Sequence, residues 1–180
     1  MKRSLMPSGS DGPAHAFVIV GTVRTPFGEV TGMPLQSVAA SEVEGRVDVL
    51  PRFAEGLRDL DGFSHIHLLT WLHRAQREAG LVVLPFLGDE PRGVFATRSP
   101  RRPNPIGLSV VRLLAIEAAS LHVAGIDLLD DTPVLDIKPY VPAFDAVAAE
   151  RIGWLAGRSA DVHTIRADER FDQRSTKDGV

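Results

Sequence analysis

The sequence contains no cysteine and no apolar stretch long enough to span a membrane. The lack of cysteine excludes disulfide bonds, thiolate nucleophiles and cysteine metal sites, and it is typical of proteins from reducing compartments. A membrane helix needs about 20 consecutive apolar residues. The first residues also lack the apolar core of a secretory signal. We therefore expect a soluble, cytoplasmic protein with no membrane segment.

Common signatures of nucleotide and metal binding are missing as well. No G-x-G-x-x-G follows a strand, and G-x-x-x-x-G-K-[ST] does not occur. His65, His67 and His73 lie in one apolar segment, but an extended chain rises ~3.3 Å per residue and separates the last two by roughly 20 Å. One ion cannot bridge that distance with bonds of about 2 Å. We expect no metal site.

The composition is that of an ordinary globular domain. The chain has 180 residues, of which 44% are hydrophobic and 24% charged, and a net charge of −3. A polyanionic ligand would therefore need a local basic patch. The segment 1–14 is rich in Ser, Gly and Pro, and 166–180 is polar. We predict one domain over 15–165 between two flexible tails.

Most of the domain has the pattern of short strands. The segments 16–25, 44–50 and 63–73 are apolar or alternating, and 63–73 would present Ile66, Leu68 and Leu72 on one face and its histidines on the other. The spacing of Phe53, Leu57 and Leu60 predicts one helix over 50–62. Many short strands with few helices predict an antiparallel β-barrel or sandwich.

The segment "FATRSPRRPNPIGLS" (95–109) combines three arginines with three prolines that restrict the backbone. Arginine gives planar, two-pronged contacts to carboxylate or phosphate and also stacks on bases. This segment has two possible interpretations, a loop that binds a ligand and a charged loop that is simply solvated. The turn at Asn104-Pro105 and the close backbone approach that Gly107 allows favour the binding loop.

The segment "DLLDDTPVLDIKPY" (127–140) is the second cluster of polar residues. Its acidic turn could hold hydroxyl or ammonium groups, and the strand after it would place Asp136, Lys138 and Tyr140 on one face. The alternative is a plain turn followed by an edge strand in which Asp136 pairs with Lys138.

These segments together resemble a known family. "GTVRTPF", "MPLQ", "LRDLDGFSHIHLLTWLH", "GVFATRSPRRPNPIGLS" and "LLDDTPVLDIKPY" occur in family order between about Phe17 and Val141. They resemble the TrmO (YaeB/TsaA-like, VirR-like) family of S-adenosylmethionine-dependent tRNA methyltransferases. Motifs of this length and composition are unusual.

The resemblance implies a small antiparallel β-barrel with one or two short helices, unlike the Rossmann fold of most methyltransferases. It implies a homodimer with S-adenosyl-L-methionine bound near the subunit contact, and methylation of N6 of threonylcarbamoyl-adenosine at position 37 of tRNA. The implied cofactor contacts are Pro34, Leu35, Gln36, His73, Arg74, Arg98, Leu108, Asp130, Asp131, Thr132 and Pro133. Arg101 and Arg102, on the same loop as Arg98, would face the RNA.

Three departures from the family pattern stand out. Leu35 replaces a frequent arginine, and Asp131 replaces a usual glycine. From the few residues that follow the match, we also expect this chain to lack the second domain of the longer bacterial members.

Asp136, Lys138 and Tyr140 are the candidates for catalysis, as a base or by positioning the acceptor. Lys138 could instead bind RNA, and Tyr140 could stack on a base. Two other functions stay open, a methyltransferase for another RNA or a small molecule and a non-catalytic RNA-binding barrel.

Overall fold

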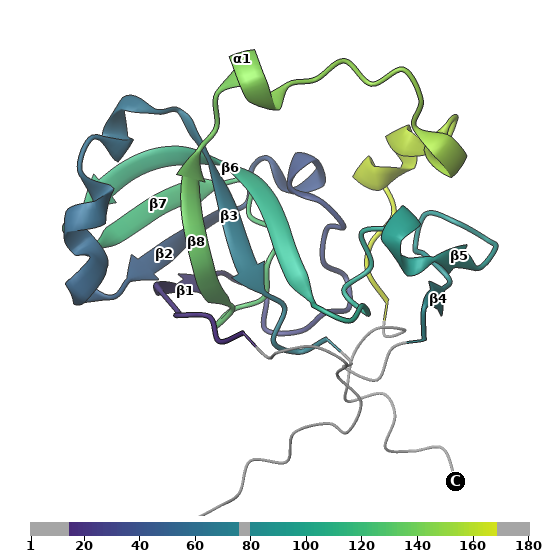
Figure 1. Ribbon diagram of the computed structural model, residues 1–180, viewed down its shortest axis with the longest axis horizontal. Helices are drawn as coiled ribbons and strands as arrows, with labels where there is room; N and C mark the ends of the chain where they lie inside the picture. Colours follow the sequence, from purple (N-terminus) through teal and green to yellow (C-terminus); the bar gives the residue numbers. More distant parts are fainter. Residues whose placement is uncertain (1–14, 76–79, 169–180) are drawn as a thin grey trace, which may run out of the picture.

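The computed structural model describes residues 15–75 and 80–168, and most of them form one closed barrel (Figure 1). Every pairing between neighbouring strands is antiparallel, and the order around the barrel is β1-β2-β7-β6-β3-β8. The predicted mainly β fold with a small antiparallel barrel is confirmed. The strands are β1 (Gly21–Arg24), β2 (Glu44–Val49), β3 (His65–Trp71), β6 (Ile106–Glu117), β7 (Ser120–Ala124) and β8 (Pro133–Pro139).

The barrel is filled by aliphatic side chains that alternate along the strands. In β3, Ile66, Leu68 and Thr70 are fully buried, whereas both histidines of the strand face outward. The predicted two faces of this segment are confirmed as far as Trp71, where the strand ends. The interior is completed by Val23, Val47, Val49, Val111, Leu121, Val123, Ile126, Leu128 and Val134.

The segment predicted as one helix over 50–62 folds differently. It forms two 3₁₀ helices, η2 (Pro51–Leu57) and η3 (Leu60–Gly62), separated by Arg58 at ψ 133° and Asp59 at φ 66°. The backbone thus leaves the helical region at the point where the predicted helix should continue. Phe53, Leu57 and Leu60 nevertheless pack against the barrel core, so the apolar face was predicted correctly and the helix type was not.

A small lobe lies beside the barrel (Figure 1). It consists of β4 (Val82–Val83) paired with β5 (Arg92–Gly93), followed by η4 (Val94–Ala96). Val83 and Val94 are buried there against Phe86. This lobe leads directly into the arginine-proline loop, so it positions the start of that loop.

The chain leaves the barrel at α1 (Pro142–Asp145) and crosses to the β4–β5 lobe (Figure 1). We call residues 153–168, which include η5 (Gly153–Leu155) and η6 (Ser159–His163), the C-terminal strap. Trp154 Nε1 donates to the Ala96 carbonyl at 2.8 Å. The strap ends in a bridge between Arg166 and Pro34, where Ala167 N donates to the Met33 carbonyl at 2.9 Å.

The first residues of the predicted 166–180 tail therefore pair with the segment before η1 (Ser37–Ala40). The predicted tail 1–14 and residues 169–180 lie outside the described residues.

Candidate functional site

Two loops far apart in the sequence meet at Gln36 and Arg98. Gln36 directly precedes η1, and Arg98 follows η4 on the exposed side of the arginine-proline loop. Arg98 Nη1 donates to Gln36 Oε1 at 2.7 Å across 62 positions of sequence. The Gln36 amide also donates to the Leu35 carbonyl at 2.6 Å, which orients its oxygen toward Arg98. The predicted segments 34–36 and 98 thus belong to one cluster.

The arginine-proline loop is folded by its own hydroxyl groups. Thr97 Oγ1 donates to the Val94 carbonyl at 2.9 Å, and the Ser99 hydroxyl accepts from Arg101 N at 3.1 Å. Arg102 Nη1 donates to the Thr97 carbonyl at 3.4 Å, and the side chains of Arg101 and Arg102 are partly buried. Arg98 is the most exposed of the three arginines. Arg102 helps to hold the loop that carries Arg98.

The predicted close approach at Gly107 is confirmed, and its partner is the barrel itself. A Cβ at this position would lie 2.5 Å from Thr70 Oγ1 and 2.9 Å from Leu72 Cδ2. Gly107 therefore lets β6 lie close against β3. The next residue, Leu108, points outward with 55% of its surface exposed.

The acidic turn after β7 is anchored to the end of β1. Asp130 N donates to the Phe27 carbonyl at 2.8 Å, and the Asp130 carboxylate accepts from Thr25 N at 3.1 Å. Thr132 is buried, and its hydroxyl donates to the Leu129 carbonyl at 2.7 Å. The turn predicted from "DDTP" is therefore closed by main-chain and side-chain bonds on both sides.

Asp131 explains how this chain accommodates the loss of a family glycine. Its φ of 61° lies in the left-handed region, which glycine adopts freely and which aspartate tolerates better than most residues. Its carboxylate also forms an ion pair with Arg24. Asp131 thus adopts a conformation open to glycine and adds a contact to β1.

His73 and Arg74 follow the end of β3 and lie near the acidic turn. Arg74 donates to the Gly28 carbonyl at 2.6 Å and pairs with Glu29 at 3.1 Å, and only 16% of its side chain is exposed. Burial lowers the pKa of His73, the charge of Arg74 lowers it further, and the charge of Asp131 acts in the opposite direction. The predicted residues 73–74 and 130–133 thus belong to the same region.

Asp127 joins these segments, although the family resemblance assigns it no contact. Its carboxylate accepts from Ser109 Oγ at 2.6 Å, and Ser37 and Arg98 lie near enough to influence its pKa. Burial raises the pKa of this carboxyl, while the two serines and the charge of Arg98 oppose the shift. The aspartate was visible in the sequence, but nothing there placed it beside Ser37, Arg98 and Ser109.

The three candidates for catalysis lie on the outer face of the barrel. The Lys138 ammonium pairs with the Asp136 carboxylate at 2.6 Å, and the Tyr140 ring packs edge-on against His67 at 5.4 Å. The alternative ion pair is therefore present, but β8 bonds to both β1 and β3 and is not an edge strand. Leu69 is the register partner of both Asp136 and Leu108, which places these two about 10 Å apart across β3.

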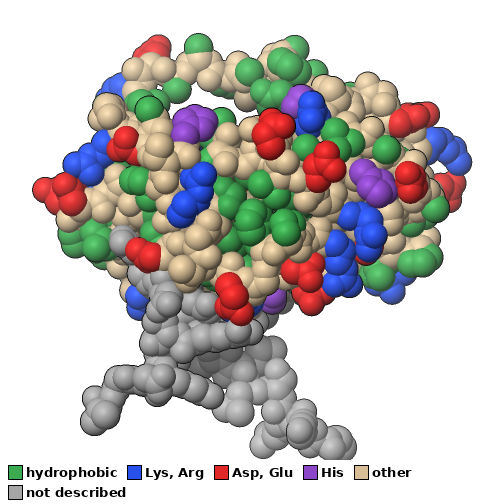
Figure 2. Space-filling model, turned by 180° about the vertical axis from the view of Figure 1, so that it is seen from behind, with side chains coloured by type: hydrophobic (Ala, Val, Ile, Leu, Met, Phe, Trp, Pro, Cys, Tyr) green, Lys and Arg blue, Asp and Glu red, His purple; other side chains and the backbone are tan. Residues whose placement is uncertain are grey.

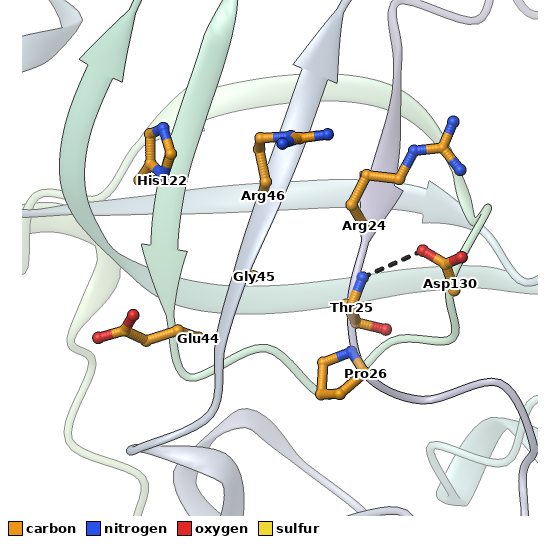
Figure 3. Close-up of a pocket in the computed structure, with 8 residues that line it drawn as sticks. All are labelled: Arg24, Thr25, Pro26, Glu44, Gly45, Arg46, His122 and Asp130. Carbon is orange, nitrogen blue, oxygen red and sulfur yellow. Dashed lines mark hydrogen bonds between the residues drawn. The ribbon is translucent and has the colours of Figure 1, made fainter.

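A shallow hollow of about 390 Å³ lies on the outside of β1, β2 and β7 (Figure 3). Arg24, Arg46 and His122 are register partners in one row across these strands. Both arginines also pair with Asp48. The row is therefore already neutralised in large part and does not form a free anion site. The hollow is lined by Arg24, Thr25, Pro26, Glu44, Gly45, Arg46, His122 and Asp130.

Charges of both signs are distributed over the reverse side of the molecule. Figure 2 shows apolar side chains near the centre of this side, with acidic and basic side chains interspersed around them. This side therefore does not present a field of one sign. Within residues 15–75 and 80–168, no helix is long and apolar enough to cross a membrane. In the same part of the chain, no three His, Asp or Glu side chains are grouped to hold a metal ion.

The fold and this cluster define a class of protein, a small antiparallel barrel whose candidate site is made by loops at its rim. The model of the tRNA-methyltransferase O N-terminal domain matches residues 22–146, and the chain belongs to this family. The predicted TrmO membership is confirmed.

Relatives of known name agree with this assignment. The chain is 49% identical over 152 residues to a Pyrococcus abyssi protein named "probable S-adenosyl-L-methionine-binding protein", covering 84% of this chain and 82% of the relative. It is 38% identical to the tRNA (adenine(37)-N6)-methyltransferase of Escherichia coli, over 70% of this chain and 57% of that enzyme.

A crystal structure of TrmO from Pseudomonas aeruginosa superposes with a TM-score of 0.67 at 44% identity, over 80% of this chain and 62% of that one. The chain therefore spans less than two thirds of the length of the E. coli and Pseudomonas proteins.

Proposed function

We propose that this protein binds S-adenosyl-L-methionine and transfers its methyl group to N6 of threonylcarbamoyl-adenosine at position 37 of tRNA. The observation that carries the proposal is the bond between Arg98 and Gln36, because it unites two of the family motifs at one place. The acidic turn and residues 73–74 approach the same rim of the barrel. The names of the family and of its relatives support the choice of cofactor and reaction.

The side chains present match the chemistry of this cofactor. S-Adenosyl-L-methionine carries a carboxylate, an ammonium group, a sulfonium and an adenine ring, and its sulfonium supplies the methyl group. The exposed guanidinium of Arg98 fits the carboxylate, because arginine binds carboxylates through two parallel hydrogen bonds. Asp130 offers a carboxylate toward the cationic groups. Leu108 and Val38, both more than half exposed, offer apolar surface for the adenine ring.

The proposed reaction leaves little chemistry for the protein beyond positioning and removal of one proton. N6 of the acceptor gains a carbon–nitrogen bond as the sulfur–carbon bond breaks, and N6 then loses its proton. Asp136 is our candidate to receive this proton, because it is the nearest of the three candidates to Leu108. Lys138 holds the Asp136 carboxylate, and Tyr140 lies one step further along the same face.

The experiment separates cofactor binding from methyl transfer. Calorimetry measures the affinity of the purified chain for S-adenosyl-L-methionine, and nucleoside mass spectrometry follows methylation of tRNA with and without the threonylcarbamoyl group. We expect micromolar or tighter binding and a new methyl group only in the modified tRNA. The Arg98→Ala variant serves as the matched control. It should bind S-adenosyl-L-methionine more weakly and methylate the tRNA more slowly than the wild type.

Two outcomes would overturn parts of the proposal. A methyl group on a different nucleoside or on a small molecule would keep the enzyme class and replace the acceptor. RNA binding without any affinity for the cofactor would instead identify a non-catalytic barrel.

We also propose a homodimer that completes the site. The outer side of β6 exposes Ile106 and Leu108. A two-fold contact over this face should bury more than about 1,000 Å². Light scattering over a dilution series, with and without S-adenosyl-L-methionine, tests it. A chain that remains monomeric while binding the cofactor tightly would contradict a shared site.

A further inference from the structure

The C-terminal strap lies outside the part of the chain that matches the family model. The match ends at residue 146, whereas the strap comprises residues 153–168. Figure 1 shows the strap, in yellow, next to the β4–β5 lobe. The strap nevertheless contacts the two loops that meet in the proposed cofactor site, the loop of Gln36 and the loop of Arg98.

The first half of the strap is bonded to the β4–β5 lobe and to the loop that follows it. Trp154 Nε1 donates to the Ala96 carbonyl at 2.8 Å, at the start of the arginine-proline loop. Arg158 donates to the Leu87 carbonyl at 3.4 Å and pairs with Asp89 at 3.0 Å. Three bonds from two side chains thus attach this end of the strap.

The last residues of the strap pair with the segment before η1 through the main chain. Ala167 N donates to the Met33 carbonyl at 2.9 Å, and both residues are buried. Arg166 is the bridge partner of Pro34, which precedes Gln36 by two residues. Between the two ends, η6 packs against η1. The second end is therefore attached close to Gln36.

The strap and the bond from Arg98 to Gln36 join the same two loops at neighbouring points. Trp154 contacts the arginine-proline loop two residues before Arg98. Arg166 contacts the other loop two residues before Gln36. The bond between Arg98 and Gln36 lies at the surface, and one such bond contributes too little free energy to order two loops by itself. The second connection through the strap is needed to keep the two side chains at a fixed distance.

We propose that the C-terminal strap is a brace that sets the distance between Gln36 and Arg98 for S-adenosyl-L-methionine. Trp154, Arg158 and Ala167 are its positioning residues, and they act through the two loops, not by contact with the cofactor. A site that is ordered before its ligand arrives binds more tightly, because binding then costs less conformational entropy. The inference rests on the cofactor site proposed above.

A double-mutant cycle between the two ends of the strap tests the inference. The lobe-end variant combines Trp154→Phe with Arg158→Ala, which removes all three bonds and retains an aromatic ring. Ala167→Pro removes the main-chain donor at the other end. Calorimetry on the full chain measures the affinity for S-adenosyl-L-methionine, and a thermal unfolding curve is recorded for each variant. We expect either change to weaken binding about 3- to 10-fold, as the loss of hydrogen bonds does.

The combined variant distinguishes a brace from two local effects. The two ends contact different loops, so independent local effects would add. If the strap acts as one unit, release of either end already frees the loops. The combined variant should then bind no more than about twofold more weakly than the weaker of the two.

Matched variants control for each change. Arg151→Ala removes an arginine from an exposed position just before the strap, and Ala167→Ser retains the main-chain donor. Both should bind like the wild type. If Ala167→Pro does not fold, the difference between the lobe-end variant and Arg151→Ala decides the question, and equal affinities overturn the brace.

Amide exchange of the cofactor-free protein provides a readout that does not depend on binding. Ala167→Pro should accelerate exchange of residues 96–99, on the loop at the far end of the strap. The lobe-end variant should likewise accelerate exchange of residues 35–37. A change limited to the loop beside each substitution would contradict a brace.

The outcomes separate this inference from the function beneath it. Wild-type affinity in both strap variants, or additive losses in the combined variant, would overturn the brace while the cofactor site stands. Wild-type affinity in Arg98→Ala would overturn the cofactor site itself, and the role of the strap in binding with it.

Discussion

The barrel wall and the rim loops of this protein are held together by different forces. In the wall, continuous strand pairing surrounds an interior of Val, Ile and Leu that is almost completely buried. At the rim, a few main-chain bonds of the acidic turn are joined by single bonds from side chains, such as Arg98 to Gln36 and Arg102 to the Thr97 carbonyl. Burial of apolar surface stabilises the barrel wall. Hydrogen bonds that each contribute a net free energy of about 1 kcal/mol stabilise the rim loops.

This difference indicates that stability and proposed function are largely separable. A change in the wall should affect the free energy of unfolding, and a change at the rim should affect ligand affinity with little effect on unfolding. Ser109 lies where the two regions meet, since it is 3% exposed within β6 and bonds to Asp127. The following variants test the comparison.

The largest effect should come from the wall. Leu68→Ala leaves a cavity at a fully buried position and should lower the free energy of unfolding by about 2–5 kcal/mol. Urea denaturation measures this loss. Leu114→Ala, at a 42% exposed position of β6, is the matched control and should change the free energy much less. Equal losses in the two variants would contradict the contrast between the barrel's interior and its surface.

Arg98→Ala should have the largest effect at the rim. The loss of a charge-assisted hydrogen bond should reduce the binding free energy of S-adenosyl-L-methionine by about 1.5–3 kcal/mol. The unfolding midpoint should stay close to the wild type, because the Arg98 side chain is exposed. Calorimetry and a melting curve on the same sample test both halves. Unchanged affinity would remove Arg98 from the cofactor site.

Arg101→Ala combined with Arg102→Ala should affect RNA binding more than cofactor binding. Each lost phosphate contact should reduce the slope of log affinity against log salt by about 0.7–0.9. Titrations of tRNA at several salt concentrations measure the slope. Because Arg102 also holds the Thr97 carbonyl, Arg102→Lys alone serves as a control that retains the charge. A slope equal to that of the wild type would place the RNA elsewhere.

Trp154→Phe should have a smaller effect, confined to the lobe. It removes the donor to the Ala96 carbonyl but retains an aromatic ring near Arg92. We expect a loss of about 0.5–1.5 kcal/mol in local stability, seen as faster amide exchange of residues 94–97. Exchange in β3 should not change. Faster exchange throughout the barrel would show that the C-terminal strap supports the wall as well.

The smallest effect concerns pH and His73. The folded state lowers the pKa of His73 below 6.5, so the unfolded chain takes up this proton more readily. The contribution of His73 is therefore fully present above about pH 6.5 and is lost as the pH falls toward the folded value. His73→Gln should make the unfolding midpoint less dependent on pH as the pH falls below about 6.5. Identical pH profiles of the unfolding midpoint in the wild type and His73→Gln would exclude a contribution of His73 to the pH dependence of stability.

The sequence predicted those parts of the molecule that depend on neighbouring residues. The alternation of β3 follows from the period of two that an extended chain imposes, and the structure shows Ile66 and Leu68 inside. Gly107 was expected at a close approach for the same local reason, since glycine has no Cβ to collide. The family motifs, finally, are continuous stretches of sequence and require no knowledge of the fold.

The tertiary structure decided everything that depends on closure of the barrel. The apolar spacing of 50–62 predicts an α-helix, but Arg58 and Asp59 leave the helical region and the segment packs on the core as two 3₁₀ helices. The bond from Ser109 to Asp127 spans 18 positions, and the bond from Arg98 to Gln36 spans 62 positions. Periodicity and turn chemistry act over a few residues, whereas such pairs form only once the closed sheet brings distant loops to the same rim.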